Sequence, residues 1–438
     1  MTGEASVLGA GLAGCEAALW LAGRGVKVTL FEQKPQKRSA AHKTDAYAEL
    51  VCSNSLKADR PDSASGLLKL EMELLGSSLL PIARRVRVAA GGALAVDRAA
   101  FAAMVTQAVK NEPNITVCEG EMAAVPREGF VIVATGPLTS GPLAEDVALL
   151  TGRKRLSFYD AAAPIVTAES LDMSKIFAAS RYGRGEADYL NCPFDKAGYE
   201  DFYDVLIHAE RAELHEPDDS LTVYEGCMPI EVMAARGADT IRYGPLRPVG
   251  LTDPRTGHRP WANVQLRRED AAGTMYNLVG FQTNLKFGEQ KRVFSKIPGL
   301  ENAEFVRYGV MHRNTFLNSP ETLDRTLALK NAPHIRFAGQ ITGFEGYMES
   351  AACGLLAAWF TLAAIRGQTP PRLPATTMCG ALLQYIGTEN ADFQPMGANM
   401  GILPPLAEAV RDKRQRYAQL SDRALRDMKA ALAGFDVG

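Results

Sequence analysis

Cys52 is the first residue of this chain whose type could serve chemistry. It lies in "AELVCSNSLK", after Val51 and before a run of small polar residues. A thiolate can act as a nucleophile or accept a proton, but a reactive cysteine needs an electropositive and accessible setting. A free cysteine more often packs as a small hydrophobic residue. From its own neighbours Cys52 is therefore interpreted as structural, and the rest of the chain must decide.

A glycine-rich loop offers a second kind of chemistry, the binding of a pyrophosphate. Gly9, Gly11 and Gly14 form the pattern G-x-G-x-x-G, and Glu32 follows about twenty residues later. The first glycine permits a tight turn, the second lets a pyrophosphate approach the backbone, and the third brings helix and strand close together. Glu32 could accept hydrogen bonds from ribose hydroxyls. The predicted dinucleotide-binding residues are Gly9, Ala10, Gly11, Leu12, Ala13, Gly14 and Glu32.

The elements around this loop are those that the chemistry requires. A short apolar strand ends at Val7 and Leu8, a helix carries Ala17, Ala18 and Leu21 on its packing face, and "VKVTLFE" is a second strand. The N-terminus of such a helix presents free N–H groups and a positive dipole end to phosphates. Strand, helix, strand and acid in this order predict a dinucleotide-binding unit.

Two later segments indicate that the dinucleotide is FAD. "GFVIVATGPL" is an apolar strand that leads into Ala-Thr-Gly, and "HIRFAGQITGFEGYMESAACGLLAAWF" is a strand, a glycine-rich turn and a long helix. Together with the first loop they resemble the large FAD-binding family of the glutathione-reductase type. In that family the last segment brings a helix N-terminus to the flavin. The residues predicted there are Gly339, Gly343, Gly346 and Tyr347. Gln340 in the same segment, and Gly136 after the mid-chain strand, are also predicted to bind the cofactor.

The predicted fold is therefore α/β, a Rossmann-like FAD-binding domain of the glutathione-reductase type with an inserted α+β domain. We expect residues 1–160 and 325–438 to form the FAD-binding domain with a C-terminal helical tail. Residues 161–324 form the insertion, on the substrate and RNA side. An amphipathic helix with Phe202 and Leu206 on one face, and a strand in "PWANVQLRRED", belong to this insertion.

Composition limits the possible partners only weakly. The 438 residues include 48 Lys plus Arg and 50 Asp plus Glu, which gives a formal charge of −2. This net charge argues neither for nor against a polyanionic partner. Seven scattered cysteines without metal-ligand spacing predict reduced thiols in the cytoplasm, with no metal site and no disulfides. The longest apolar run, 353–365, is too short to span a bilayer and predicts a buried helix.

Local clusters of basic residues could contact the phosphates of a nucleic acid. They lie at Arg84, Arg85 and Arg87, at Arg153, Lys154 and Arg155, at Arg267 and Arg268, and at Lys413, Arg414 and Arg416.

Long segments of the chain are similar to the TrmFO family, the folate- and FAD-dependent tRNA (uracil-5-)-methyltransferases related to the flavoprotein MnmG. The resemblance covers essentially the whole chain. It rests on segments such as "GAGLAGCEAA", "AELVCSNSL", "VIVATGPLTS", "EGCMPIE", "GPLRPVGLTDPRTG", "NLVGFQTNLK", "IPGLENAEFVRYGVMHRNT" and "FEGYMESAACG".

The resemblance implies methylation of C5 of a uridine in the T-arm of tRNA. The one-carbon donor would be 5,10-methylenetetrahydrofolate, reduced FAD would supply the electrons, and NAD(P)H would be a transient reductant. Neither DNA nor a membrane is expected as a partner, and the oligomeric state is not predicted. The family assigns the cysteine of its "EGC" segment as nucleophile, here Cys227, and the cysteine of "VCSNS" to the base or flavin site, here Cys52. The structural interpretation of Cys52 is thereby reversed.

Other roles carried over from the family stay open. Tyr347 is expected beside the flavin, and His312 is a candidate for stacking on the folate. Arg247 and Lys286 are candidates for binding the folate glutamate or RNA phosphates. Three alternatives remain: a general FAD oxidoreductase acting on a small molecule, a tRNA-binding module with structural FAD, and the same methylation on ribosomal RNA.

Overall fold

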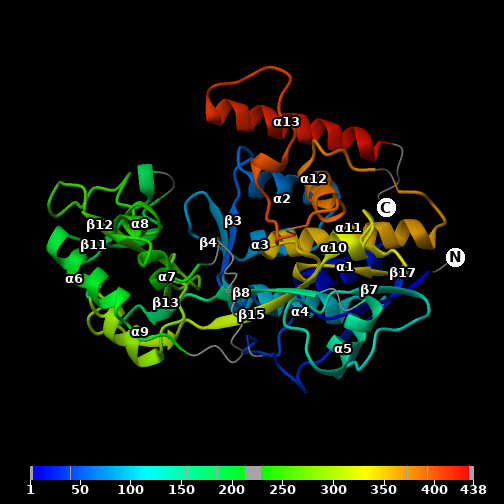
Figure 1. Cartoon of the computed structure of the whole chain (residues 1–438), viewed down its shortest axis with the longest axis horizontal. Helices are drawn as coiled ribbons and strands as arrows, with labels where there is room; N and C mark the ends of the chain where they lie inside the picture. The colour runs from blue at the N-terminus through cyan, green and yellow to red at the C-terminus, as the bar shows by residue number, and fades with distance from the viewer. Residues whose placement is uncertain are drawn as a thin grey trace.

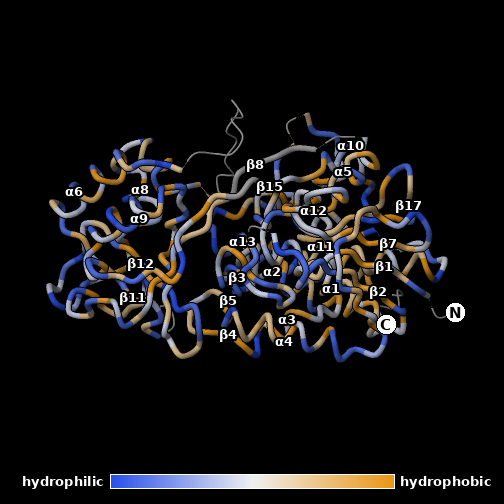
Figure 2. The backbone as a smooth tube through the Cα atoms, turned by 90° about the horizontal axis from the view of Figure 1, so that it is seen from below, coloured by the Kyte–Doolittle hydropathy of each residue, from blue (hydrophilic) through white to orange (hydrophobic). Residues whose placement is uncertain are grey.

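The computed structural model describes residues 3–39, 41–152, 155–183, 186–212, 228–370, 372–391 and 393–433, with the backbone alone for residues 155–160, 312 and 313. Two lobes lie side by side in both views (Figures 1 and 2). The larger lobe carries both ends of the chain, and the smaller lobe is formed by the middle of the sequence (Figure 1).

A six-stranded sheet in the order β16-β17-β7-β1-β2-β6 forms the centre of the larger lobe. Neighbouring strands run parallel except β16 with β17. The central strands are mostly apolar, as expected where helices cover a parallel sheet. Strands from both ends of the sequence pair in this sheet, so the domain is discontinuous. The strands are β1 (Glu4–Leu8), β2 (Lys27–Glu32), β6 (Ile115–Glu119), β7 (Phe130–Val133), β16 (Ala328–Leu329) and β17 (Ala332–Phe337).

The helices of this lobe include α1 and α11, which pack against each other. A Cβ atom at Gly354 of α11 would lie only 2.1 Å from the carbonyl oxygen of Ala13 in α1, so glycine allows this approach. The lobe contains α1 (Leu12–Ala22), α2 (Ala64–Leu74), α3 (Leu79–Arg85), α4 (Arg98–Asn111), α5 (Gly141–Leu150), α10 (Ser319–Thr322), α11 (Tyr347–Ile365), α12 (Met378–Ile386) and α13 (Lys413–Leu432).

Helix α11 contains the long apolar run of the sequence. The predicted buried helix over 353–365 is present, but it begins earlier, at Tyr347. Within the described ranges it is the one helix that is long and apolar enough to cross a membrane, and it is mostly buried inside the protein. Burial of this kind is what the central helix of a globular core shows.

The smaller lobe contains its own sheet and its own apolar core. Its six strands, in the order β10-β11-β12-β13-β9-β14, pair antiparallel. The predicted amphipathic helix is α6, with Phe202 and Leu206 fully buried. The elements are β9 (Ile165–Thr167), β10 (Phe177–Ala178), β11 (Tyr189–Phe194), α6 (Lys196–Ile207), α7 (Ile230–Ala234), α8 (Ala238–Tyr243), β12 (Ala262–Arg268), β13 (Met275–Leu278), α9 (Phe287–Phe294) and β14 (Phe305–Arg307).

The chain passes between the lobes twice, through two antiparallel strands, β8 (Arg155–Ala161) and β15 (Met311–Leu317). Beside this joint lies a small sheet in the order β3-β5-β4, formed by β3 (Ser55–Ala58), β5 (Ala93–Val96) and β4 (Arg87–Val88). The predicted fold class, a Rossmann-like domain with an inserted α+β domain, is confirmed.

Candidate active site

The first glycine-rich loop forms the floor of a cavity at the carboxyl end of β1. Gly9 has a φ of +95°, and a Cβ atom there would lie 2.7 Å from the Ala134 carbonyl oxygen. A Cβ atom at Gly14 would lie 1.8 Å from the Gly9 carbonyl oxygen. At Gly11 a Cβ atom would meet no protein atom within 4 Å. Two of the glycines are thus required by the protein itself, whereas Gly11 keeps space open in front of α1.

Glu32 lies at the end of β2 and is nearly fully buried. Its Oε2 accepts a hydrogen bond from the Ala10 N–H at 2.7 Å, and its Oε1 accepts one from the Lys34 N–H at 3.0 Å. Each carboxylate oxygen has more than one lone pair. Glu32 therefore fixes the glycine-rich loop and still has acceptor capacity towards the cavity that it lines.

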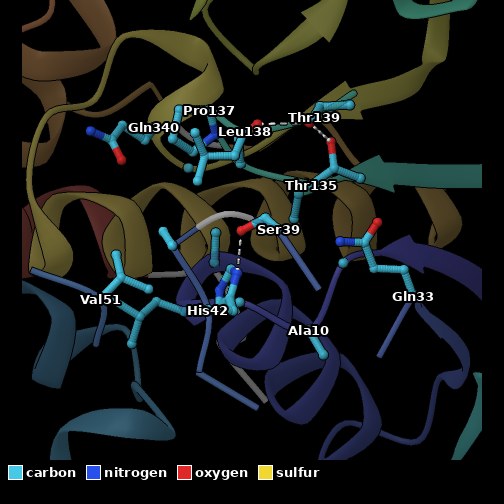
Figure 3. A pocket seen from close by; sticks show the side chains of 18 of the residues that line it. Ala10, Gln33, Ser39, His42, Val51, Thr135, Pro137, Leu138, Thr139 and Gln340 are labelled. Carbon is cyan, nitrogen blue, oxygen red and sulfur yellow. Dashed lines mark hydrogen bonds between the residues drawn. The ribbon is translucent and has the colours of Figure 1, made fainter. Parts of the chain in front are cut away.

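The cavity runs from this loop to the start of α11 and encloses about 1520 Å³, its open mouth included. Figure 3 shows it from close by, with Ala10 and Gln33 from the first βαβ unit and Gln340 from the segment before α11. The predicted cofactor residues that line it are Gly9, Ala10, Gly11, Leu12, Ala13, Glu32, Gly136, Gly339, Gln340 and Tyr347. Gly14, Gly343 and Gly346 are not among the residues that line it. A glycine cradle, a helix N-terminus and a buried acid along one cavity fit a dinucleotide such as FAD.

The second glycine-rich turn shapes the other end of the cavity. Gly339 has a φ of +83°, and a Cβ atom there would lie 2.9 Å from the Ala13 Cβ atom. Gly346 has a φ of +121° and precedes α11, where a Cβ atom would meet the Lys57–Glu349 ion pair. These close approaches bring the N-terminal ends of α1 and α11 to the same cavity.

Sequence reasoning missed the polar residues that line the cavity from loops. His42 and Ser39 lie in the loop after β2, with the Ser39 Oγ 2.6 Å from the His42 Nδ1 (Figure 3). Burial lowers the pKa of His42, which favours the neutral ring. Thr135 and Thr139 are linked by a hydroxyl–hydroxyl hydrogen bond of 2.7 Å at the opposite wall. These loops have no hydrophobic periodicity, and one sequence gives no other signal for them.

Cys52 lines the cavity beside Tyr347. The Tyr347 hydroxyl oxygen accepts hydrogen bonds from the N–H groups of Cys52, at 2.6 Å, and Ser53, at 3.1 Å. Burial, with the nearby Cys52, raises the pKa of the Tyr347 phenol far above its usual value, so the side chain stays protonated. The structure thus brings the "VCSNS" segment and the start of α11 together, although 294 residues separate them.

The other predicted catalytic residue, Cys227, lies outside the described residues. Of the other described cysteines, Cys118 in β6 is half-buried like Cys52 but does not line the cavity. Cys15, Cys192, Cys353 and Cys379 are buried, and burial raises the pKa of each thiol, to about 12 for Cys353. Such thiols are not ionised near neutral pH, which fits packing roles. The described cysteines form no disulfide.

The three residues predicted to bind substrate, Arg247, Lys286 and His312, are not among the residues that line this cavity. Arg247 is exposed in the segment between α8 and β12, where its carbonyl oxygen accepts a hydrogen bond from Arg181. Lys286 is exposed just before α9 and pairs with Glu210 at 2.6 Å. The backbone of His312 pairs with residue 160 between β15 and β8, and its side chain lies outside the description.

The prediction of a basic surface cluster at Arg267 and Arg268 is partly wrong. Arg267 was expected to lie with Arg268 on a basic surface, but Arg267 is only 7% exposed. Its Nε donates to the Asn54 Oδ1 at 2.8 Å and its Nη2 donates to the Ser53 Oγ at 2.7 Å. The strand period of β12 turns Arg267 inward, towards the "VCSNS" segment. Of the other clusters, Arg153 and Lys154 lie outside the described residues. No set of metal-ligating side chains occurs in the part of the chain that the structure describes.

Comparison with known proteins identifies the family of this chain. Residues 4–369 match the family model of glucose inhibited division protein A. The protein named methylenetetrahydrofolate--tRNA-(uracil-5-)-methyltransferase TrmFO of Acetivibrio thermocellus is 55% identical over 97% of each chain. A protein of the same name from Moorella thermoacetica is 56% identical over 97% of each chain.

A solved structure of Aquifex aeolicus GidA has the same fold. It superimposes with a TM-score of 0.68 over 98% of this chain and 75% of that one, at 15% identity. The resemblance predicted from the sequence segments is confirmed by the relatives. The chain therefore belongs to the glucose inhibited division protein A family and, within it, to the methylenetetrahydrofolate--tRNA-(uracil-5-)-methyltransferases called TrmFO.

Proposed function

We propose that this protein methylates C5 of a uridine in tRNA, with 5,10-methylenetetrahydrofolate as one-carbon donor and FAD as bound cofactor. The observation that carries the proposal is the long cavity with the glycine cradle at one end and Cys52 beside Tyr347 at the other. A redox cofactor held by this cradle would share the cavity with the Cys52 thiol. Relatives that carry this activity in their names match the chain along almost its entire length.

The reaction explains why thiols are needed. C5 of uracil is a poor nucleophile, but addition of a thiolate to C6 gives an enolate that can attack from C5. Bound FAD, once reduced by NAD(P)H, supplies the electrons that convert the transferred methylene into a methyl group. After the one-carbon transfer the C5 proton must leave. Cys227 fits the addition to C6, and Cys52, which lines the cavity, fits the proton transfer.

The substrate uridine is proposed to lie in the T-arm of tRNA. We further propose that the enzyme works in the cytoplasm, and that the smaller lobe faces the RNA. His312, Arg247 and Lys286 remain candidates for contacts with folate or phosphate groups. Lys286 and Arg247 are exposed on the smaller lobe, which supports a role with RNA over one inside the cavity.

The deciding experiment combines unmodified tRNA, methylenetetrahydrofolate labelled in its one-carbon unit, and NAD(P)H. Label in 5-methyluridine of the T-arm supports the proposal. NAD(P)H oxidation without label in RNA would indicate a general FAD oxidoreductase, and label in ribosomal RNA but not in tRNA would overturn the substrate assignment.

A trapping experiment separates the two cysteines. A T-arm RNA that contains 5-fluorouridine cannot lose its C5 substituent as a proton, so a thioether at C6 should accumulate. Wild-type protein and Cys52→Ala should both form this adduct on a denaturing gel, and Cys227→Ala should form none. Adduct formation by Cys227→Ala but not by Cys52→Ala would reverse the two assignments.

A further inference from the structure

Three arginines surround the segment that carries Cys52, and each holds a different part of it. Arg98, the first residue of α4, donates to the Leu50 carbonyl oxygen. Arg267 of β12 donates to the side chains of Ser53 and Asn54. Arg307, the last residue of β14, donates from its Nη2 to the Cys52 carbonyl oxygen at 3.2 Å. The larger lobe supplies one of these cations and the smaller lobe supplies two.

Among the residues that the structure describes, positive charge exceeds negative charge around the segment that carries Cys52. Among the described groups, one carboxylate belongs to this set: Glu269, whose Oε2 pairs with Arg98 at 2.8 Å. Tyr347 is a neutral phenol, as its raised pKa requires. Lys57 and Glu349, beside the start of α11, pair with each other at 2.7 Å and cancel. Three guanidinium groups against one carboxylate leave an excess of positive charge.

Each of the three guanidinium groups interacts electrostatically with Cys52. The Nε of Arg307 is buried and has no hydrogen-bond partner among the described residues, so no described carboxylate accepts a hydrogen bond from it. In its thiol form the Cys52 Sγ donates a weak hydrogen bond to the Ala161 carbonyl oxygen, 3.7 Å away.

We propose that Arg98, Arg267 and Arg307 form a cationic cradle that holds Cys52 as a thiolate. Reactive cysteines occur in electropositive and partly accessible places of this kind. The use of the thiolate rests on the proposed function: its sulfur forms the S–H bond as the C5–H bond breaks, and the electron pair of that bond stays on the uracil ring. The arginines are positioning residues, since they act through Cys52.

The cradle also links the two lobes to the chemistry. Arg267 reaches Ser53 and Asn54, and Arg307 reaches the Cys52 carbonyl oxygen, only while the smaller lobe packs against the larger one. A different explanation is that these arginines serve solely to join the lobes. The two explanations differ in one measurable property, the ionisation of the Cys52 thiol.

The test measures alkylation of Cys52 by iodoacetamide in the holoenzyme across pH, read by mass spectrometry of the Cys52 peptide. Arg307→Gln should slow the reaction near pH 7 by at least about tenfold, because a nearby opposite charge commonly shifts a titrating group by a unit or more. Arg307→Lys keeps the charge and should restore most of the rate. The long-wavelength absorbance that a thiolate gives with oxidised flavin should shift along the same pH axis.

Tyr189→Phe is the matched control. It removes the hydrogen bond of 3.1 Å from the Tyr189 hydroxyl to the Ala90 carbonyl oxygen, another contact between the lobes. Tyr189 lies opposite Arg267 in the register of β11 with β12, and the substitution keeps the aromatic ring and all three guanidinium groups. Its pH profile should equal that of the wild type. The proposal would be overturned if Tyr189→Phe and Arg307→Gln changed the pH profile of Cys52 alkylation equally. It would also be overturned if Arg307→Gln changed neither the alkylation rate nor the flavin absorbance. Because alkylation needs neither RNA nor folate, this result is independent of whether the protein methylates tRNA.

Discussion

Replacing Gly11 by valine separates the binding of FAD from the folding of the chain. Gly11 precedes α1 with φ −76° and ψ −171°, an extended conformation that valine adopts readily. A Cβ atom there meets no protein atom within 4 Å, so the new side chain fills only the space in front of the helix. At Gly14, three residues later, a Cβ atom would lie 1.8 Å from a backbone oxygen.

The two variants should therefore fail in different ways. For flavin-free Gly11→Val the free energy of unfolding should stay within about 1 kcal/mol of the wild type. Glycine is favourable at the position before a helix, so its loss destabilises the fold. Valine lowers the conformational entropy of the unfolded chain, which stabilises the fold and opposes that loss. Gly14→Ala must push backbone apart and should lose about 1–3 kcal/mol or more. At an FAD concentration of about 100 Kd the wild type gains about 2.7 kcal/mol, and Gly11→Val should gain none.

The assay is urea unfolding with and without FAD, together with the flavin absorbance of the purified proteins. Wild-type protein should be yellow, and Gly11→Val should be colourless but folded. Full flavin occupancy in Gly11→Val would refute the assignment of the glycine-rich loop. Unfolding of flavin-free Gly11→Val as easily as Gly14→Ala would show that the space at Gly11 serves the fold and not a ligand.

Three further predictions concern other parts of the chain. Gly354→Ala should lower the free energy of unfolding by about 1–3 kcal/mol, because the new Cβ atom forces α11 away from Ala13. The control is Gly288→Ala in α9, where a Cβ atom meets nothing within 4 Å. It should cost less than about 1 kcal/mol in the same urea titration. Burial raises the pKa of Glu16 to about 7 from its usual 4.5, so this group stabilises the fold fully below about pH 4.5 and less as the pH rises through 7. Unfolding across pH should show this loss in the wild type and a flatter profile in Glu16→Gln. Cys227→Ala should keep its flavin spectrum and its slow NAD(P)H oxidation without RNA; loss of the flavin would make Cys227 a structural residue.

The first βαβ unit could be predicted because its interactions are local in sequence. Gly9, Gly11 and Gly14 and the acid at position 32 lie within one strand–helix–strand unit, where each residue type has a separate steric or electrostatic reason. The contact of Gly354 with Ala13 could not be predicted, since nothing in either helix indicates its partner. A glycine inside a long apolar helix shows only that something approaches closely.

The site around Cys52 shows the limit of sequence reasoning more sharply. Composition and neighbours favoured a structural cysteine, and only the family resemblance reversed that interpretation. The proposed cause of its reactivity lies in residues that are distant in sequence. Arg267, expected on a basic surface, is buried against the "VCSNS" segment. The sequence positions of charged residues do not reveal such a contact. Packing of the two lobes decides which side of the strand is buried, and the sequence of the strand does not show this.

The protonation states along the cavity support the choice of Cys52 as the base. Tyr347 lies beside Cys52, but its raised pKa keeps it a phenol, and its oxygen already accepts two N–H groups, so it suits donating a proton and not removing one. Glu32 is held by the backbone at the end of β2, next to the glycine-rich loop where the ribose is expected. His42 lies in the loop after β2 and pairs with Ser39. Of these groups, Cys52 alone combines a place beside Tyr347 with an electropositive surrounding, and a thiolate there can take the C5 proton without first losing one of its own.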